Sequence, residues 1–150
     1  MRVVIQRVSR ASIHINKELH SSIGKGLLVL LGIEAEDELS DVEYLCKKIA
    51  GLRIFSDDEG KMNLSLKDIQ GDCLLVSQFT LFANTSKGNR PSFIQAARPE
   101  IAVPLYEACI QNLNEHLDRK IQTGEFGADM QIELINDGPV TLLIDSKAKN

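Results

Sequence analysis

The run from Gly26 to Ile33 constrains the fold more than any other segment, because it is the longest uninterrupted apolar stretch in the chain. It has the length of a β-strand and falls far short of the roughly 18 residues that a membrane span requires. Apolar residues occupy both faces of such a strand, so we expect it to be buried on both sides within a sheet. The run therefore indicates a globular core and not a membrane segment.

The chain has 150 residues, of which 43% are hydrophobic, and this fits one domain spanning 1–150. A chain of this length buries roughly 70% of its unfolded surface without a disulfide or metal staple. The three cysteines, Cys46, Cys73 and Cys109, lie far apart within apolar stretches. We expect buried, reduced thiols and neither a metal site nor a cofactor.

The chain begins with arginines and glutamine among its valines, and this pattern lacks the apolar block of a signal peptide. We therefore expect a cytoplasmic protein. The net charge of −4 argues against a protein that coats nucleic acid generally. It leaves room for a local basic patch that grips one end of an RNA.

Hydrophobic periodicity predicts many strands and two main helices. Val42, Leu45, Cys46 and Ile49 recur at helical spacing within 38–50, and a second helix is expected at 99–119. Besides the apolar run, the predicted strands are 2–8, 12–16, 19–23, 52–55, 73–82, 129–135 and 139–145, the last two joined at Asp137-Gly138. Mixed strands and helices predict an α+β fold with a curved sheet or barrel.

Two segments place polar or rigid residues where simple strands do not need them. Ser77–Ala83 introduces two hydroxyls and an amide into an apolar strand, and Asn136–Thr141 contains a Gly-Pro step. A buried and unpaired polar group costs roughly 1–3 kcal/mol, and a strand that ends at the mouth of a pocket avoids that loss. A strand that simply meets solvent explains the first segment equally well.

Together, in this order, the two segments resemble the D-aminoacyl-tRNA deacylases, and the resemblance runs from Met1–Val8 to Ile144. It implies a small mixed barrel with two helices that works as a homodimer. It also implies hydrolysis of the ester of D-aminoacyl-tRNA at its 3′ end, which releases free D-amino acid and tRNA. Glycyl-tRNA, including glycine mischarged on tRNA-Ala, is expected as a second substrate, because glycine has no side chain to reject.

The resemblance assigns Ser77, Gln78, Phe79 and Thr80 to the catalytic pocket for the aminoacyl end of tRNA. Hydroxyl or backbone N–H groups of this segment can bind the ester carbonyl and its developing oxyanion.

Gly138-Pro139 is expected, on the same resemblance, to be a cis peptide that enters the partner subunit's pocket and rejects L-amino acids. Arg7, on the first strand, is our choice for the residue that holds the carbonyl groups of this corner. From sequence alone, a Gly-Pro turn between strands needs no function and is usually trans.

A third segment, 123–130, also resembles the family and contains Phe126 and Met130. These two side chains are candidates for an apolar pocket wall, and core packing is the equal alternative. Lys87 and Arg90 lie in a polar loop after the pocket segment. They are candidates for RNA phosphate contacts, with a solvated loop as the alternative.

The sequence places no general base beside a hydroxyl. His14, His20 and His116 are all remote from the serine and threonine of the pocket segment. A side-chain nucleophile at Ser77 or Thr80 is therefore unsupported. The resemblance implies instead attack by water assisted by the terminal 2′-hydroxyl of the RNA, which fits the missing base better. An RNA-binding module without catalysis and a small-molecule esterase stay open as alternatives.

Overall fold

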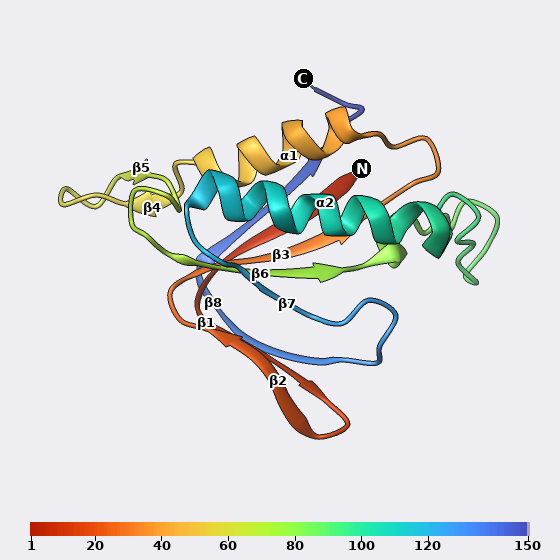
Figure 1. Cartoon of the computed structure of the whole chain (residues 1–150), viewed down its shortest axis with the longest axis horizontal. Coiled ribbons are helices and arrows are strands. Elements are labelled where there is room, and N and C mark those ends of the chain that lie inside the picture. The colour runs from red at the N-terminus through yellow and green to blue at the C-terminus, as the bar shows by residue number, and fades with distance from the viewer. Residues whose placement is uncertain (150) are drawn as a thin grey trace.

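The computed structural model describes residues 1–149. Two α-helices and a mixed sheet form the body of the molecule, with a small ribbon at one side (Figure 1). In chain order the elements are β1 (Arg2–Ile15), β2 (Glu18–Ile23), β3 (Gly26–Gly32), α1 (Leu39–Gly51), β4 (Phe55–Ser56), β5 (Met62–Leu64), β6 (Asp72–Ser77), the 3₁₀ turn η1 (Phe79–Phe82), α2 (Pro99–Leu117), β7 (Gln122–Thr123) and β8 (Gln131–Asp145).

β1 organises the sheet, because three strands pair with it in the antiparallel sense. β3 pairs with its first half and β2 with its second half, while β8 runs along its other edge. β6 then pairs with β3 and β7 pairs with β6, both in the parallel sense. The sheet curls nearly into a barrel, so the predicted α+β fold with a curved mixed sheet and two helices is confirmed.

β3 is buried on both faces, as its continuous apolar sequence predicts. Leu27, Val29 and Leu31 pack in one core cluster with the residues of α1 and α2. Leu28 points the other way and packs with Val8, in a second cluster on the opposite face of the sheet. Each fully buried leucine contributes roughly 1.5–3 kcal/mol, so this strand anchors both layers.

The helices cover one face of the sheet side by side (Figure 1). α1 buries the predicted stripe, and Asp41 caps its start by accepting a hydrogen bond from the Glu38 backbone N–H at 2.9 Å. Gly51 is the last helical residue, and extended Leu52 ends the helix. α2 begins at Pro99, as predicted, and ends at Leu117. Within residues 1–149, neither helix has the length and apolarity to cross a membrane.

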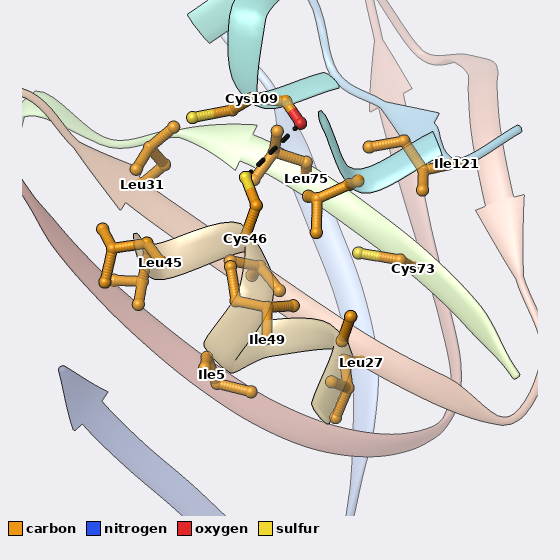
Figure 2. Packing of buried hydrophobic residues seen from close by; sticks show 14 of the residues in the cluster. Ile5, Leu27, Leu31, Leu45, Cys46, Ile49, Cys73, Leu75, Cys109 and Ile121 are labelled. Carbon is orange, nitrogen blue, oxygen red and sulfur yellow. Dashed lines mark hydrogen bonds between the residues drawn. The ribbon is translucent and has the colours of Figure 1, made fainter. Parts of the chain in front are cut away.

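The three cysteines lie between the helices and the sheet (Figure 2) and are free thiols. The Cys46 thiol points at the Cys109 carbonyl oxygen, 3.7 Å away. Burial raises the pKa of Cys73 to about 12. A hydrogen bond with Cys46, together with burial, raises the pKa of Cys109. The expectation of buried, reduced thiols is confirmed.

Several predicted strand limits are wrong, and the reasons are tertiary. Residues 2–8 and 12–16 form one strand, because β8 supports β1 across the break. The predicted strand at 52–55 is absent, and only Phe55 and Ser56 pair, with β5. β6 ends at Ser77, five residues before the predicted limit. The two predicted C-terminal strands are one strand with a bulge at its centre, since both halves pair with β1.

Candidate functional site: a pocket at the end of β6 and a corner on β8

β6 delivers the pocket segment to the surface. Ser77 is the last residue of the strand, paired with Leu31, and the backbone N–H of Gln78 still donates to the Leu31 carbonyl at 2.7 Å. The chain then leaves the sheet and enters η1, where the Phe79 side chain is 57% exposed. The polar residues of this segment therefore sit where a buried strand ends, as the pocket interpretation requires.

Two hollows adjoin this segment and share Ser77, Gln78, Phe79 and Gly127. One is an apolar cavity of about 70 Å³, completed by Leu31, Ile33, Ala97, Ala102 and Phe126. The other is more open, about 240 Å³, and is completed by Val76, Ala128, Met130 and Ile132. The structure thus brings the predicted residues 77–79, Phe126 and Met130 together around one site.

Phe126 and Met130 serve the core as well as the hollows. The Phe126 ring lies 5.7 Å from the Tyr106 ring, between centroids. The Met130 sulfur lies so close to Gly124 that a Cβ there would meet it at 2.6 Å. Each of the two side chains therefore lines a hollow and also packs against the core, so the two alternatives left open by the sequence apply at once.

The hydroxyls of the segment have no basic partner in the part of the chain that the structure describes. The Gln78 amide donates to the Thr80 hydroxyl, and no histidine bonds to Ser77 or Thr80. The first two backbone N–H groups of η1, those of Phe79 and Thr80, precede its first internal bond, which Leu81 donates to Gln78. These N–H groups are available to a ligand oxygen beside the pocket.

The second predicted element is a corner, residues 136–141, that bulges out of β8. Gln6 pairs with Thr141 and Val8 with Asn136, so the residues between them have Arg7 as their only counterpart on β1. The Gly138–Pro139 peptide is cis, and both residues are exposed.

Arg7 ties this corner to the body of the molecule. Its Nε donates to the Asp137 carbonyl at 2.8 Å, and its Nη1 donates to the Ile54 carbonyl at 2.7 Å. The predicted contact between Arg7 and a corner carbonyl is therefore present. The contact with Ile54 could not be predicted from sequence, since a backbone carbonyl has no side-chain signature.

Asn136 and Thr141 close the base of the corner. The Asn136 side-chain oxygen accepts from the Val140 backbone N–H at 2.8 Å, and its amide donates to the Thr141 hydroxyl at 3.0 Å. Gly138 has φ +146°, and a Cβ there would meet the Val140 nitrogen at 2.8 Å. Only glycine fits this position without moving the backbone.

The corner lies away from the pocket of its own chain. Ile132 of β8 lines the open hollow, and Asn136, where the corner leaves the pairing with β1, lies four residues farther along the strand, roughly 13 Å at strand spacing. Arg7 joins the corner to Ile54, next to β4. Figure 1 places β4 and the arrowhead end of β6 at opposite ends of the molecule.

The predicted RNA loop borders the pocket segment. Lys87 and Arg90 line a hollow of about 310 Å³ with Asn84, Ser86, Ser92, Ile94 and Gln95. Backbone bonds between Asn84 and Ser92, at 2.8 and 2.9 Å, close the base of this loop. An edge-to-face contact between Phe79 and Phe93, 5.1 Å between ring centroids, links the loop to the pocket segment.

The pocket also contains residues that the sequence did not single out. Leu31, Ile33, Ala97 and Ala102 are small or aliphatic, and such residues read as core from sequence alone. Gly127 lies in the segment 123–130 that resembles the family, and its φ of +81° permits the turn beside the pocket.

Known D-aminoacyl-tRNA deacylases match this chain along nearly its whole length. The model of the D-Tyr-tRNA(Tyr) deacylase family matches residues 4–145. D-aminoacyl-tRNA deacylases from Cytophaga hutchinsonii and Porphyromonas gingivalis are 64% and 60% identical to this chain over 149 residues, which is 99% of this chain and 99% of each relative.

Solved structures give the same fold. One, described as a c-Myc DNA unwinding element binding protein, has a TM-score of 0.91 at 42% identity and covers 97% of this chain and 98% of that one. Another, described as a probable eukaryotic D-amino acid tRNA deacylase, has a TM-score of 0.82 at 17% identity, over 95% and 97% of the two chains, and supports the fold alone. With its fold, pocket segment and sequence all in agreement, the chain belongs to the D-Tyr-tRNA(Tyr) deacylase family.

Proposed function

We propose that this deacylase binds the aminoacyl end of tRNA against residues 77–80 and checks its chirality with the corner of a second copy of the chain. Family membership makes the protein a D-aminoacyl-tRNA deacylase, a hydrolase acting on a carboxylic ester bond. The observation that carries the proposal is the separation of the exposed corner from its own pocket. We place the enzyme in the cytoplasm, where aminoacyl-tRNA is used.

Binding of the ester is assigned to the start of η1. Ser77 and Phe79 line both hollows, and Thr80, which lines neither, follows Phe79 as the next N–H donor of η1. Fixed donors of this kind stabilise the negative charge that develops on the carbonyl oxygen during hydrolysis, which is typically the largest contribution to catalysis of acyl transfer.

The attacking group in this proposal is water. Its oxygen forms a bond to the ester carbonyl carbon, the bond to the ribose oxygen breaks, and the ribose leaves as a hydroxyl. The neighbouring 2′-hydroxyl of the terminal nucleotide assists the proton transfer. The absence of a base bonded to Ser77 or Thr80 within residues 1–149 favours this route over a covalent acyl-enzyme.

A homodimer brings corner and pocket together in trans. Asp137, Gly138 and Pro139 are exposed, and the same strand exposes Ile135 and Leu143 on either side, at 45% and 69%. Apolar side chains that flank a projecting loop are typical of an interaction surface. The outer edge of β8 has no partner strand among residues 1–149, so a second copy can approach it.

The chirality check is steric. A backbone corner pressed against the α-carbon leaves room for a hydrogen there and clashes with an L side chain, while the D side chain points elsewhere. Since no corner side chain is involved, any D side chain is tolerated. Glycine passes the same check, so glycyl-tRNA, including glycine mischarged on tRNA-Ala, is a substrate in this proposal.

Hydrolysis of matched D- and L-tyrosyl-tRNA by the purified dimer tests the proposal. We expect rapid release of D-tyrosine and no release of L-tyrosine above the spontaneous rate. Binding of tRNA without release of either amino acid would instead favour an RNA-binding module. Equal hydrolysis of a free D-tyrosine ester and D-tyrosyl-tRNA would favour a small-molecule esterase.

A further inference from the structure

A basic hollow lies on the side of the molecule away from the pocket. It has a volume of about 450 Å³ and is formed by the C-terminal turns of α1 and the segment that follows. Its lining residues are Tyr44, Lys47, Lys48, Gly51, Leu52 and Arg53. Neither the pocket nor the corner uses these side chains.

The cations of this hollow are available to a ligand. In the described part of the chain, the lining residues Lys47 and Lys48 take part in no ion pair, and neither does Lys149, which lies over the lining residue Tyr44. Lys149 and Lys48 lie over the Tyr44 ring, with their nitrogens 4.4 and 5.9 Å from its centroid. A lysine at the end of α1 also favours the helix dipole, but Lys149 and Arg53 come from outside the helix.

Arg53 is fixed at the rim of the hollow. Its Nε donates to the Asn63 carbonyl at 2.9 Å, and its guanidinium also contacts the Asn63 side chain. Hydrogen bonds with Ser65 lower the pKa of the nearby Asp68 carboxylate, and the positive charge of Arg53 lowers it further. Since Arg53 is held by Asn63, the hollow combines one oriented guanidinium with two lysines that form no ion pair in the described chain, a combination suited to a chain of phosphates.

The basic hollow is joined directly to the corner. Arg53 directly precedes Ile54, whose carbonyl accepts a hydrogen bond from Arg7. The Arg7 guanidinium also donates to the Asp137 carbonyl of the corner. Hollow and corner are therefore neighbours, at the β4 end of the molecule (Figure 1).

We propose that the basic hollow binds phosphates of the acceptor strand of the tRNA whose aminoacyl ester occupies the partner subunit's pocket. This rests on the proposed function, in which the corner enters that pocket. The corner then carries the basic hollow to the pocket rim, where the RNA leaves toward its stem. In a chain of net charge −4, this local positive surface matches a polyanion that must pass that rim.

The double variant Lys47→Gln/Lys48→Gln tests the hollow. We expect KM for D-tyrosyl-tRNA to rise roughly tenfold near physiological salt, with kcat unchanged and the slope of log KM against log salt reduced by about 2. Hydrolysis of D-tyrosyl-adenosine, which has no stem phosphates, should be unchanged. The charge-matched control Lys17→Gln/Lys120→Gln, at exposed sites outside the hollow, should leave the tRNA KM unchanged.

Mixed dimers test which of the two pockets each hollow serves. Gly138→Ala breaks the corner, so a dimer with one such chain keeps one working pocket. With the lysine changes on the same chain as Gly138→Ala, the remaining pocket is served by an intact hollow and should show wild-type KM. With the lysine changes on the opposite chain, KM should rise roughly tenfold.

Three results separate the possible failures. The reverse pattern of KM values in the two mixed dimers would place the hollow in service of its own pocket and overturn the inference. An unchanged KM and salt slope in the Lys47→Gln/Lys48→Gln homodimer would also overturn it, while leaving the corner's role intact. Full activity of Gly138→Ala homodimers would instead overturn the proposed function on which the inference rests.

Discussion

The pocket segment and the corner are both short, polar interruptions of a strand, but they are held in place differently. Residues 77–80 follow a strand buried on both faces, so the core fixes their backbone. The corner at 136–141 lies on an exposed strand and is held by the side chains of Arg7 and Asn136. The pocket should therefore tolerate loss of single polar groups, whereas the corner should fail when its backbone or its supports change.

The largest effect is expected at Gly138. In Gly138→Ala the new Cβ would meet the Val140 nitrogen at 2.8 Å, so the corner must move. A shift of about 1 Å can cost roughly 100-fold, and we expect a loss of that size in kcat/KM for D-tyrosyl-tRNA with the melting temperature kept. Gly60→Ala, at another positive φ with open space around it, is the matched control. Wild-type kinetics for Gly138→Ala would remove the contrast between the two regions.

Arg7→Gln should come next. It removes the guanidinium that joins the Asp137 and Ile54 carbonyls, so the corner is less well positioned but not displaced by a clash. We expect kcat to fall roughly 10–30-fold, with KM for tRNA little changed and L-tyrosyl-tRNA hydrolysis becoming detectable. Measuring both stereoisomers is essential, since a merely structural role would lower stability without changing the ratio of D to L rates.

Loss of the Thr80 hydroxyl should have a smaller effect. Thr80→Ala keeps the backbone N–H of residue 80, and backbone hydrogen bonds, which the substitution does not change, hold the η1 turn. We expect the rate of hydrolysis to stay at a few per cent of wild type or above, whereas loss of a true nucleophile costs orders of magnitude. Trapping of an acyl-enzyme at Thr80 or Ser77 would refute the water mechanism.

The double variant Lys87→Gln/Arg90→Gln sharpens the description of the pocket side. These side chains line a hollow beside the pocket segment without shaping it. We expect KM for tRNA to rise by a few-fold and its salt dependence to flatten, with kcat preserved. A salt slope identical to that of the wild-type enzyme would place the RNA elsewhere on this face.

The smallest effect concerns the cysteines. All three thiols are buried, out of reach of a reagent in solution, and burial also raises the pKa of Cys73 to about 12. We expect a maleimide to leave native protein unlabelled and fully active over an hour, and to modify all three cysteines after unfolding. Rapid labelling with loss of activity would show that the core between the helices opens readily.

The sequence predicted those parts of the fold that depend on local periodicity. β3, α1 and α2 were correctly identified, because their apolar residues already specify which faces are buried. The end of β6 was not, since Phe79, Leu81 and Phe82 are as compatible with a strand as with η1. The continuity of β8 as one strand could not be predicted either, because it depends on pairing with β1, whose residues lie 117 to 143 positions away in the sequence.

The site shows the same division. Polar residues at 77–80 and the Gly-Pro step stood out because they interrupt apolar patterns. Ala97 and Leu31 did not, because an apolar pocket wall looks like core in a sequence. The basic hollow could not be predicted from sequence, because it forms only where α1 ends and the chain turns toward β4, which brings together Lys47, Lys48 and Arg53.

Complementation between two inactive chains tests most directly whether the corner acts in the partner's pocket. One chain carries Ala97→Phe, whose ring would fill the cavity of about 70 Å³, and the other carries Gly138→Ala. Each homodimer should be nearly inactive, and the mixed dimer should recover about half of the wild-type rate, since one intact pocket then meets one intact corner. A mixed dimer as inactive as its parents, with activity recovered when both changes lie on one chain opposite a wild-type chain, would contradict the account.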